Sequence, residues 1–418
     1  MKLSQPQFET ASLFLLDGLA NVIDFAFHFW MGRVLIPADF AILQTLNSIA
    51  LVYITASGVF QPVVGRFVAE ARGKERYDSI PAIFQSFLRT AFYLGAILSI
   101  LVFSLSNPIA HILNLPPWTI RLSAALIFLS TLRPIAVGVL LGQERFIAFG
   151  IARLALSIGR ILFVISLIQT VPGLTGAVLA LPFGWLASVL CAFLFLGGAL
   201  WRKKSETPPQ NVLSEGWKLS AYALLAYAAY MSLTSLDLVW VNRSLDGESA
   251  GAYASLVLIR RIVALLPGVA VTVMFPRIVK ILAQGQRPHR LLTQTAIIIF
   301  TAGGTLAILY FVFANQLMGR VFDTTYLDAA PLLGWMGIAM MGVSLSSIWL
   351  NYFLSERPRN FVILLALAVA LEWTLLNLFS PSLQNAVLAF GATGWSLTIG
   401  GFILYSRRLP QRVNAASQ

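Results

Sequence analysis

The feature that most constrains this chain is a series of long apolar stretches separated by short polar connections. Most of the stretches run for 20 to 27 residues, and a helix needs about 20 apolar residues to cross the hydrocarbon core of a bilayer. Charged residues make up 11% of the 418, against roughly 25% in soluble domains. A soluble, disordered or disulfide-stapled fold is therefore excluded. The twelve stretches cover residues 10–33, 40–66, 84–106, 117–141, 146–170, 174–200, 216–243, 250–276, 290–316, 328–353, 360–379 and 384–406.

Positive charge is divided unevenly between alternate connections. One set of connections holds most of the lysines and arginines, whereas the other holds only Arg33, Arg121, Arg243 and Arg320. The positive-inside rule places the richer set in the cytoplasm. Both termini then lie in the cytoplasm, which requires an even number of spans and agrees with twelve. The net charge of +12 is explained by these loops, and we expect no nucleic-acid partner.

The connections of the other set are short. The longest are Ser106 to Pro117 and Gly319 to Asp328, which we expect to be loops without a domain of their own.

The two halves of the chain resemble each other weakly. Asp237 in the seventh stretch follows Asp24 in the first by 213 residues, and Pro276 follows Pro62 by 214. Six spans in each half give both halves the same orientation, as in transporters built from parallel repeats. We therefore predict an all-α polytopic membrane protein with twelve transmembrane helices in two parallel six-helix bundles.

The most polar inner segment marks the boundary between the halves. It lies near the middle of the chain and contains two consecutive prolines, as linkers often do. The predicted domains are an N-terminal bundle at 1–200, a cytoplasmic linker at 201–216 and a C-terminal bundle at 217–418.

About nine ionisable residues fall inside the predicted spans. Each costs about 2.5–3.5 kcal/mol at the centre of a membrane helix, so most of them must face a wet cavity or one another. They are Asp17, Asp24, Asp237, Glu372, Arg133, Arg153, Arg160, Arg260 and Arg261.

Helical spacing gathers several of these residues into polar stripes. Asp17, Asn21, Asp24 and His28 share one face of the first span. Tyr227, Tyr230, Thr234 and Asp237 form the corresponding stripe of the seventh. We expect these two spans to form the wall of a cavity.

Structural alternatives exist for the same residues. Asp237 with Arg260 or Arg261 fits a static ion pair that joins two helices. Arg153 and Arg160 fit contacts with the interface or with a lipid headgroup. For Glu372, which has no polar stripe around it, we expect a structural partner.

Motifs of the common enzyme classes are missing from the sequence. It has no phosphate-binding loop ending in GK[ST], no HExxH, no CxxC and no GxSxG. Its three histidines are scattered. We expect no enzyme, no catalytic residues, no metal site and no cofactor.

The region around the eighth span resembles a known family. It has Gly251-Ala252-Tyr253 entering the span, Arg260-Arg261 within it and Phe275-Pro276-Arg277 at its end. With the acids in spans one and seven, this pattern resembles the multidrug/oligosaccharidyl-lipid/polysaccharide (MOP) exporter superfamily, and within it the polysaccharide-biosynthesis branch.

The resemblance implies a MATE-like fold and a flippase for polyprenyl-diphosphate-linked oligosaccharides in the bacterial inner membrane. A diphosphate is a natural ligand for guanidinium groups, so we expect Arg260, Arg261, Arg153, Arg160 and Tyr253 to bind the cargo. Asp24, Asp237 and Asp17 are the expected ion-coupling or gating acids, with a proton or a sodium ion as partner. Other expected partners are membrane lipids and polysaccharide-assembly proteins.

Two alternatives remain open. A multidrug or organic-cation antiporter of the same superfamily would need the acids and could dispense with the arginines. A membrane-embedded polymerase, ligase or assembly factor would need a larger outer loop than the sequence offers.

Overall fold

The computed structural model describes residues 5–167, 171, 173–197, 212–284, 286–356 and 358–415, which contain helices and no strand. In the first half the helices are α1 (Gln5–Val34), α2 (Pro37–Gly58), α3 (Phe60–Gly73), α4 (Ile80–Ser104), α5 (Ser106–Leu113), α6 (Pro117–Gly142), α7 (Phe146–Leu167) and α8 (Leu174–Leu196). In the second half they are α9 (Val212–Leu233), α10 (Leu236–Ser244), α11 (Gly247–Ala283), α12 (His289–Val321), α13 (Ala330–Glu356), α14 (Arg359–Leu378) and α15 (Leu383–Ala415). Short 3₁₀ turns cover Tyr77–Ser79 and Thr324–Ala329.

The predicted all-α membrane architecture is confirmed. Among the described residues, nine helical segments are long and apolar enough to cross a membrane, and the bent pair α9 and α10 makes a tenth. The long helices α1 and α11 carry several ionisable residues and fall outside that set. With these two, the count reaches the twelve predicted spans.

The seventh span is broken in its middle, where it bends by 42° between Leu233 and Leu236. The second span passes from α2 to α3 at Val59, which keeps helical backbone angles, so these two helices form one span. A break inside a membrane helix frees backbone carbonyls, which then need donors from elsewhere in the protein. The apolar stretches themselves gave no sign of the break in the seventh span.

The two longest outer connections are short, as predicted, and both contain helical turns. The connection from Ser106 to Pro117 contains α5, which ends at Asn114 in the left-handed conformation that often terminates helices. In the other loop, Gly319 to Asp328, α12 continues to Val321 and a 3₁₀ turn follows. Short amphipathic helices escape an analysis that looks for spans of membrane length.

The chain divides into two compact units by its internal packing. The N-terminal unit comprises Met1–Leu35 and Ile49–Leu224, and the C-terminal unit comprises Ile36–Ser48 and Leu225–Gln418. The first turns of α2 thus belong to the C-terminal unit, and α9 changes unit after Leu224. The predicted linker at 201–216 lies mostly outside the described residues.

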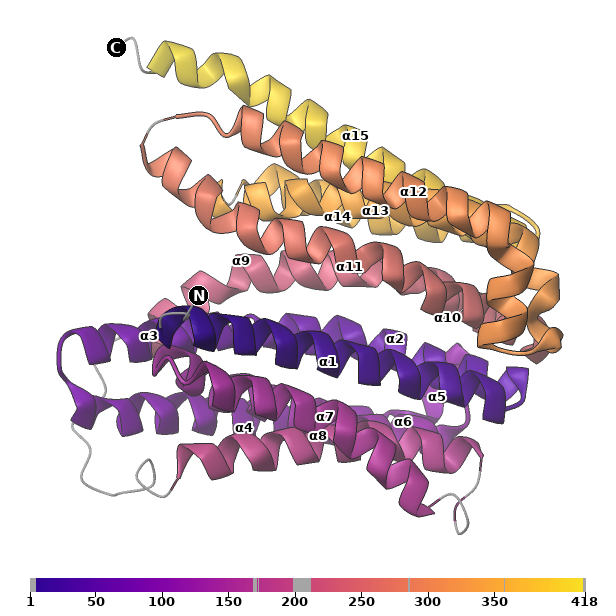
Figure 1. Cartoon of the computed structure of the whole chain (residues 1–418), viewed down its shortest axis with the longest axis horizontal. Coiled ribbons are helices and arrows are strands. Elements are labelled where there is room, and N and C mark those ends of the chain that lie inside the picture. Colours follow the sequence, from indigo (N-terminus) through magenta and orange to yellow (C-terminus); the bar gives the residue numbers. More distant parts are fainter. Residues whose placement is uncertain are drawn as a thin grey trace. The chain divides into compact units, whose positions relative to one another are not determined.

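In the N-terminal unit, α7 packs between α1 and α8, and α6 packs against α3, α4 and α8 (Figure 1). Glycines allow α3 and α6 to approach closely. A Cβ atom at Gly138 would lie 2.7 Å from the Gln61 carbonyl oxygen, and one at Gly142 would lie 2.7 Å from Val68 Cβ. Small residues at such crossings are typical of membrane helices, whose association depends on tight packing.

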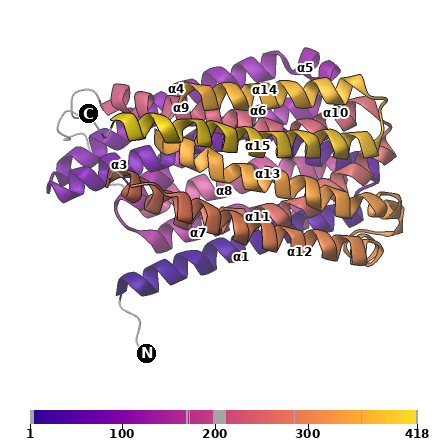
Figure 2. The same ribbon diagram turned by 90° about the horizontal axis from the view of Figure 1, so that it is seen from above.

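In the C-terminal unit, α15 lies between α13 and α14 (Figure 2). The span that contains α13 is the most enclosed of this unit, with 78% of its apolar window buried. Glycines again set the spacing, since a Cβ at Gly342 would meet the indole of Trp395 at 2.8 Å.

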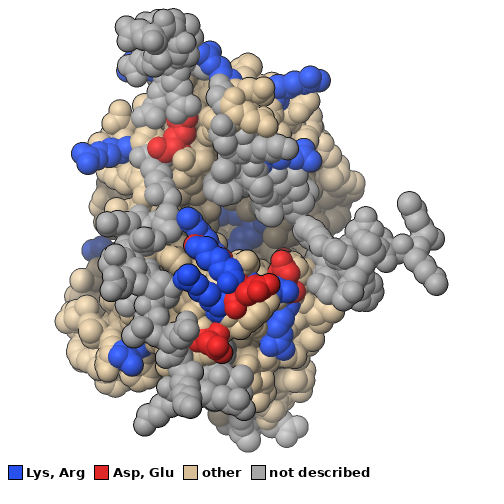
Figure 3. All heavy atoms as spheres, turned by 90° about the vertical axis from the view of Figure 1, so that its left-hand side faces the viewer, with Lys and Arg blue, Asp and Glu red and all other residues tan. Residues whose placement is uncertain are grey.

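Charged side chains gather where helices end. Figure 3 looks onto the left-hand side of Figure 1, where basic and acidic groups lie close together. In the N-terminal unit, Arg72 at the end of α3 pairs with Glu144 just after α6 at 2.8 Å, and also donates to the Gln143 carbonyl oxygen. Such exposed pairs contribute about 0–1 kcal/mol.

The start of α11 yields a prediction about stability. Asp246 precedes the helix, and its carboxylate accepts hydrogen bonds from the backbone N–H of Ser249 at 2.9 Å, from that of Glu248 at 3.1 Å and from the Ser249 hydroxyl. Asp246→Ala should cost about 1 kcal/mol, the usual value of an N-cap. Thermal unfolding in detergent should show the loss, and Glu248→Ala, which keeps the cap, is the matched control.

The same cap should depend on pH. Hydrogen bonds from Ser249, first from its backbone N–H, hold the pKa of Asp246 below its ordinary value. A group with a lowered folded pKa stabilises the protein fully above its unfolded value of about 3.9, and this stabilisation is lost as the pH falls through the folded value. The difference between the wild type and Asp246→Ala should therefore shrink in acid. A difference that is unchanged there would contradict the assignment.

Candidate functional site

The polar stripe of α1 faces α7 inside the N-terminal unit. Arg153 on α7 donates to the Asn21 side-chain oxygen at 3.0 Å and lies 3.5 Å from the Asp17 carboxylate. Two turns further along α7, Arg160 pairs with Asp24 at 2.5 Å. The predicted stripe exists, and its partners are the basic residues of the fifth span.

The two pairs differ in how far they are open to solvent or lipid. The side chains of Arg153 and Asp17 are 26% and 50% exposed, whereas those of Arg160 and Asp24 are 6% and 30% exposed. Arg153 can therefore reach a ligand without leaving its place. Arg160 is enclosed, and a ligand would have to displace Asp24 or the helices around it.

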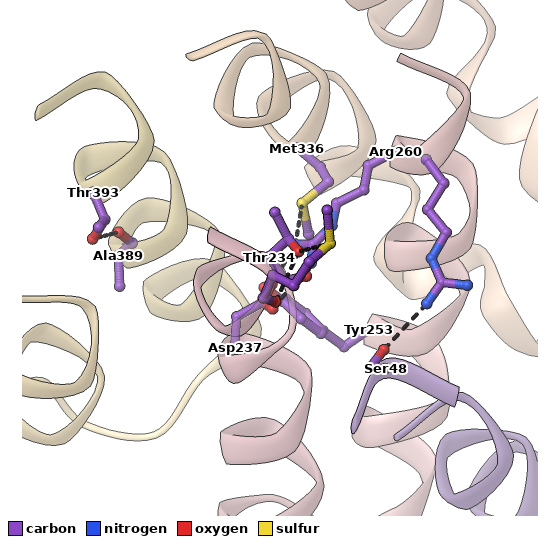
Figure 4. A network of polar contacts seen from close by, with 10 residues as sticks. Ser48, Thr234, Asp237, Tyr253, Arg260, Met336, Ala389 and Thr393 are labelled. Atoms are coloured by element: carbon purple, nitrogen blue, oxygen red, sulfur yellow. Dashed lines mark hydrogen bonds and ion pairs between the residues drawn. The ribbon is translucent and has the colours of Figure 1, made fainter. Parts of the chain in front are cut away.

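In the C-terminal unit, Asp237 is the centre of a closed polar cluster (Figure 4). Arg260 binds both of its carboxylate oxygens, and the Tyr253 hydroxyl donates to one of them at 2.7 Å. Asp237 and Tyr253 are fully buried, and Arg260 is 2% exposed. The ion pair that we weighed as a structural alternative is present, and it joins α10 to α11.

The break between α9 and α10 completes this cluster. The second terminal nitrogen of Arg260 donates to the Thr234 carbonyl oxygen at 2.8 Å. This carbonyl lies at the bend of the seventh span, where helical hydrogen bonding is interrupted. The guanidinium also lies over the Phe390 ring, 3.9 Å from its centroid. Arg260 thus binds the acid and the freed backbone together.

Arg261, the neighbour of Arg260, points elsewhere. It donates to the Ser48 hydroxyl at 3.2 Å and is only half-buried. Ser48 belongs to the part of α2 that packs in the C-terminal unit. The two adjacent arginines therefore have different environments, and Arg261 is the more accessible.

We expected Glu372, which lies on α14, to have a structural partner. It is fully buried, and neither of its carboxyl oxygens has a hydrogen-bond partner among the described residues. It lies within electrostatic reach of Asp237 and Arg260. The cluster therefore contains two acids and one base in an enclosed place.

Arg133 on α6 is the residue that the site prediction missed. It is 8% exposed, and its Nε donates to the Ser188 hydroxyl on α8 at 2.7 Å. Its guanidinium carbon lies 5.4 Å from the centroid of the Trp185 ring. Its position inside a span was the available signal, but no polar stripe accompanied it.

A largely apolar cavity of about 190 Å³ lies within the N-terminal unit. Aliphatic and aromatic side chains from α2, α3, α4 and α6 form most of its lining, and Ser57, Thr90, Ser130 and Thr131 contribute hydroxyls. Tyr53 lines it as well, and its hydroxyl lies within electrostatic reach of Arg160. None of the predicted cargo-binding residues lines this cavity.

Among the described residues, no three His, Cys, Asp or Glu side chains come together in a way that could hold a metal ion.

The arrangement is that of a polytopic membrane protein with ion pairs among the helices of each of its two compact units. No family model matches the chain, and no curated protein matches its sequence. Solved structures do match it along nearly its whole length.

One of these is the inward-facing conformation of a multidrug resistance MATE family transporter of the MOP superfamily. It matches with a TM-score of 0.73 and 13% identity, over 95% of this chain and 96% of that one. The lipid II flippase MurJ in an inward closed conformation matches with a TM-score of 0.71 and 12% identity, over 96% of this chain and 87% of that one. The MATE transporter ClbM in complex with Rb⁺ matches with a TM-score of 0.61 and 16% identity, over 99% and 98%.

The chain therefore has the fold shared by MATE transporters and MurJ. The predicted MATE-like arrangement of helices is confirmed, whereas the resemblance to the MOP superfamily stays a prediction. Sequence identities this low show the fold alone, so the cargo has to be inferred from the chemistry of the site.

Proposed function

We propose that this chain is a MOP-type membrane transporter that flips a polyprenyl-diphosphate-linked oligosaccharide across the bacterial inner membrane by alternating access. The observation that carries the proposal is the excess of arginine over available acid within the spans. Asp17, Asp24 and Asp237 each already have an arginine beside them. Counted over the spans, five arginines stand against four acids, since Glu372 is the fourth, so the interior has a small excess of positive charge. This excess suits a cargo with a diphosphate, which guanidinium groups bind bidentately.

Accessibility ranks the five predicted cargo-binding residues. Arg153 and Arg261 are partly exposed, so we assign them to the cargo phosphates. Arg160, Arg260 and Tyr253 are buried against acids. We assign them to holding Asp24 and Asp237, with cargo contact only in a state that opens those pairs.

The three predicted ion-coupling or gating acids also differ in accessibility, so we assign them different roles. Asp17 and Asp24 have partly exposed carboxylates and are our candidates for ion coupling with a proton or a sodium ion. Asp237 is closed off by Arg260 and Tyr253, so we assign it to gating. The match to ClbM with Rb⁺ supports an ion partner for this fold.

An antiporter of organic cations is the second candidate, and the match to a multidrug transporter favours it. The two candidates depend on different residues. A cationic substrate needs the carboxylates of Asp17 and Asp24 and is repelled by the arginines. An anionic cargo needs Arg153 and Arg261.

Reconstitution into vesicles tests the proposal. Transbilayer movement of a polyprenyl-diphosphate oligosaccharide should be about tenfold slower or worse in Arg153→Ala and in Arg261→Ala, because a hydrogen bond to a charged group contributes about 1.5–3 kcal/mol. Arg89→Ala, which removes an exposed arginine on α4, is the matched control and should leave the rate unchanged. Full activity in both single variants and in their double variant would rule out the assignment.

The same vesicles identify the coupling ion. Movement should accelerate under an imposed proton or sodium gradient and lose this acceleration in Asp24→Asn. Movement without any gradient dependence would keep the flippase and remove the coupling role of the acids. Gradient-driven efflux of organic cations, with no movement of the lipid-linked sugar, would select the antiporter instead.

We also propose a location and partners for the protein. The connections that hold most of the lysines and arginines are assigned to the cytoplasm by the positive-inside rule, and both termini lie on the same side as these connections. Lipid-linked oligosaccharide and membrane lipids are the direct partners, and polysaccharide-assembly proteins are the expected neighbours.

A further inference from the structure

The apolar cavity of the N-terminal unit has no part in the function proposed above. Its volume of about 190 Å³ exceeds the roughly 150 Å³ of an engineered apolar cavity that binds benzene. Its lining follows three stretches of helix, Tyr53 to Phe60 across α2 and α3, Phe87 to Leu98 on α4 and Ile127 to Ile135 on α6. At 1.5 Å per residue the α4 side is about 16 Å long. The cavity is therefore elongated.

The lining offers a ligand almost no polar contact. Four of its hydroxyls already donate to backbone carbonyl oxygens, and these belong to Ser57, Thr90, Ser130 and Thr131. The hydroxyl of Tyr53 is buried and has no hydrogen-bond partner among the described residues. A charged or strongly polar ligand would lose its hydration here without regaining hydrogen bonds, which is costly. The chemistry of the lining thus selects hydrocarbon.

The depth of the cavity in the membrane points to the same class of ligand. The lining stretch of α4 lies near the middle of Ile80–Ser104, and that of α6 lies near the middle of Pro117–Gly142. The middle of a membrane-spanning helix crosses the hydrocarbon core, and lipid headgroups lie at its ends. The cavity is therefore at the depth of lipid chains.

The surface of α4 offers a way into the cavity. Among the described segments that could cross a membrane, the one that contains α4 is the least enclosed, with 17% of its apolar window buried. Ala91 is 8% exposed and Leu98 is 38% exposed, and both line the cavity. Leu98 thus belongs to the lining and to the outer surface of the unit, where lipid chains pack.

We propose that this cavity binds the methyl end of one acyl chain of a membrane lipid, which enters from the bilayer beside Leu98. An acyl chain is long and thin, as the cavity is, and its methyl end has no polar group. A bilayer lipid is favoured over the polyprenyl chain of the cargo, because none of the five predicted cargo-binding residues lines the cavity. Tyr53 lies within electrostatic reach of Arg160, so the bound chain lies close to the Asp24–Arg160 pair.

Photolabelling from the bilayer tests the site. The full-length protein is reconstituted into phosphatidylcholine vesicles that contain a small fraction of phosphatidylcholine with a diazirine near the methyl end of one acyl chain. After illumination, mass spectrometry of peptides should find the label on Phe87 and Ile127. These side chains line the cavity and are only 3% and 8% exposed, so a chain on the outer surface does not reach them.

Variants that fill the cavity show whether the label arrives through it. Ala91→Leu adds bulk to the α4 wall and should reduce the label on Ile127 severalfold. Ile97→Phe, which enlarges a 63% exposed side chain on the same helix, is the matched control and should keep the label. If Ala91→Leu folds poorly, Ala56→Leu fills the cavity from α2 and should give the same loss.

Three outcomes would overturn the proposal. Labels confined to exposed side chains would leave the cavity without an acyl chain. A label on Ile127 that both filling variants keep would show that the chain arrives by another route. A loss of this label when a small fraction of polyprenyl phosphate is added, beyond what dilution explains, would assign the cavity to the chain of the cargo.

Discussion

Replacing Asp237 with alanine is expected to destabilise the protein by about 3–5 kcal/mol, because the change leaves Arg260 buried without its counter-charge. The guanidinium is 2% exposed and would keep the Thr234 carbonyl, the sulfur of Met336 and the Phe390 ring as direct contacts, with Glu372 within electrostatic reach but without a hydrogen bond to it. Tyr253 would also lose the acceptor of its hydroxyl. Thermal unfolding of the purified protein in detergent measures the effect, with a large fall in the unfolding temperature.

The double variant Asp237→Leu/Arg260→Met shows whether charge or contact is responsible. Replacing a buried ion pair by apolar residues of similar size is often neutral or stabilising, so the double variant should recover most of the loss. Arg261→Met is the matched control, since it removes the adjacent arginine, whose side chain is only half-buried, and should change stability less. A loss below about 1 kcal/mol in Asp237→Ala would show that the pair is solvated in the working protein.

The architecture could be predicted well because the bilayer sets the length of a span. About 20 apolar residues per crossing and the distribution of positive charge determine the number and direction of helices. The break after Leu233 could not be predicted in the same way, because it depends on a side chain that satisfies the freed backbone. Arg260 does so at Thr234, from 26 residues further along the chain.

The candidate site could be predicted only in part. Helical spacing correctly placed Asp17, Asn21 and Asp24 on one face, but the identity of the opposing helix comes from the fold. Arg160 lies 136 residues after Asp24, whereas Arg260 lies only 23 after Asp237. The repeated acids of the two halves thus have bases from non-equivalent spans, which a repeat in sequence cannot indicate.

Each unit encloses one ionisable group that has no directly bonded counter-charge among the described residues. In the N-terminal unit it is Arg133, which donates to Ser188. In the C-terminal unit it is Glu372, whose carboxyl oxygens have no hydrogen-bond partner. Natural proteins keep such groups inside membranes mostly where they serve function, and the buried acid Glu372 is a candidate for exchange with an ion.

Replacing Glu372 with methionine is accordingly expected to raise stability by about 1–3 kcal/mol, because it removes a buried group whose oxygens have no partner. Glu372→Gln is the matched control, because it keeps unsatisfied polar atoms in the same volume and should give little of this gain. Thermal unfolding of the three proteins in detergent compares them directly. A loss of stability in Glu372→Met would show that the carboxyl group has a partner, such as water, in the folded protein.

Transport measurements on the same variants show whether Glu372 takes part in transport or only lowers stability. If Glu372 exchanges an ion during the cycle, Glu372→Met should be more stable and yet slower in the vesicle assay, the trade-off that functional sites commonly show. Because Glu372 lies within reach of Asp237 and Arg260, protonating or ionising it changes the attraction that holds this pair together. A variant that is both more stable and fully active would remove Glu372 from the mechanism and leave the Asp237–Arg260 pair as a structural joint between α10 and α11.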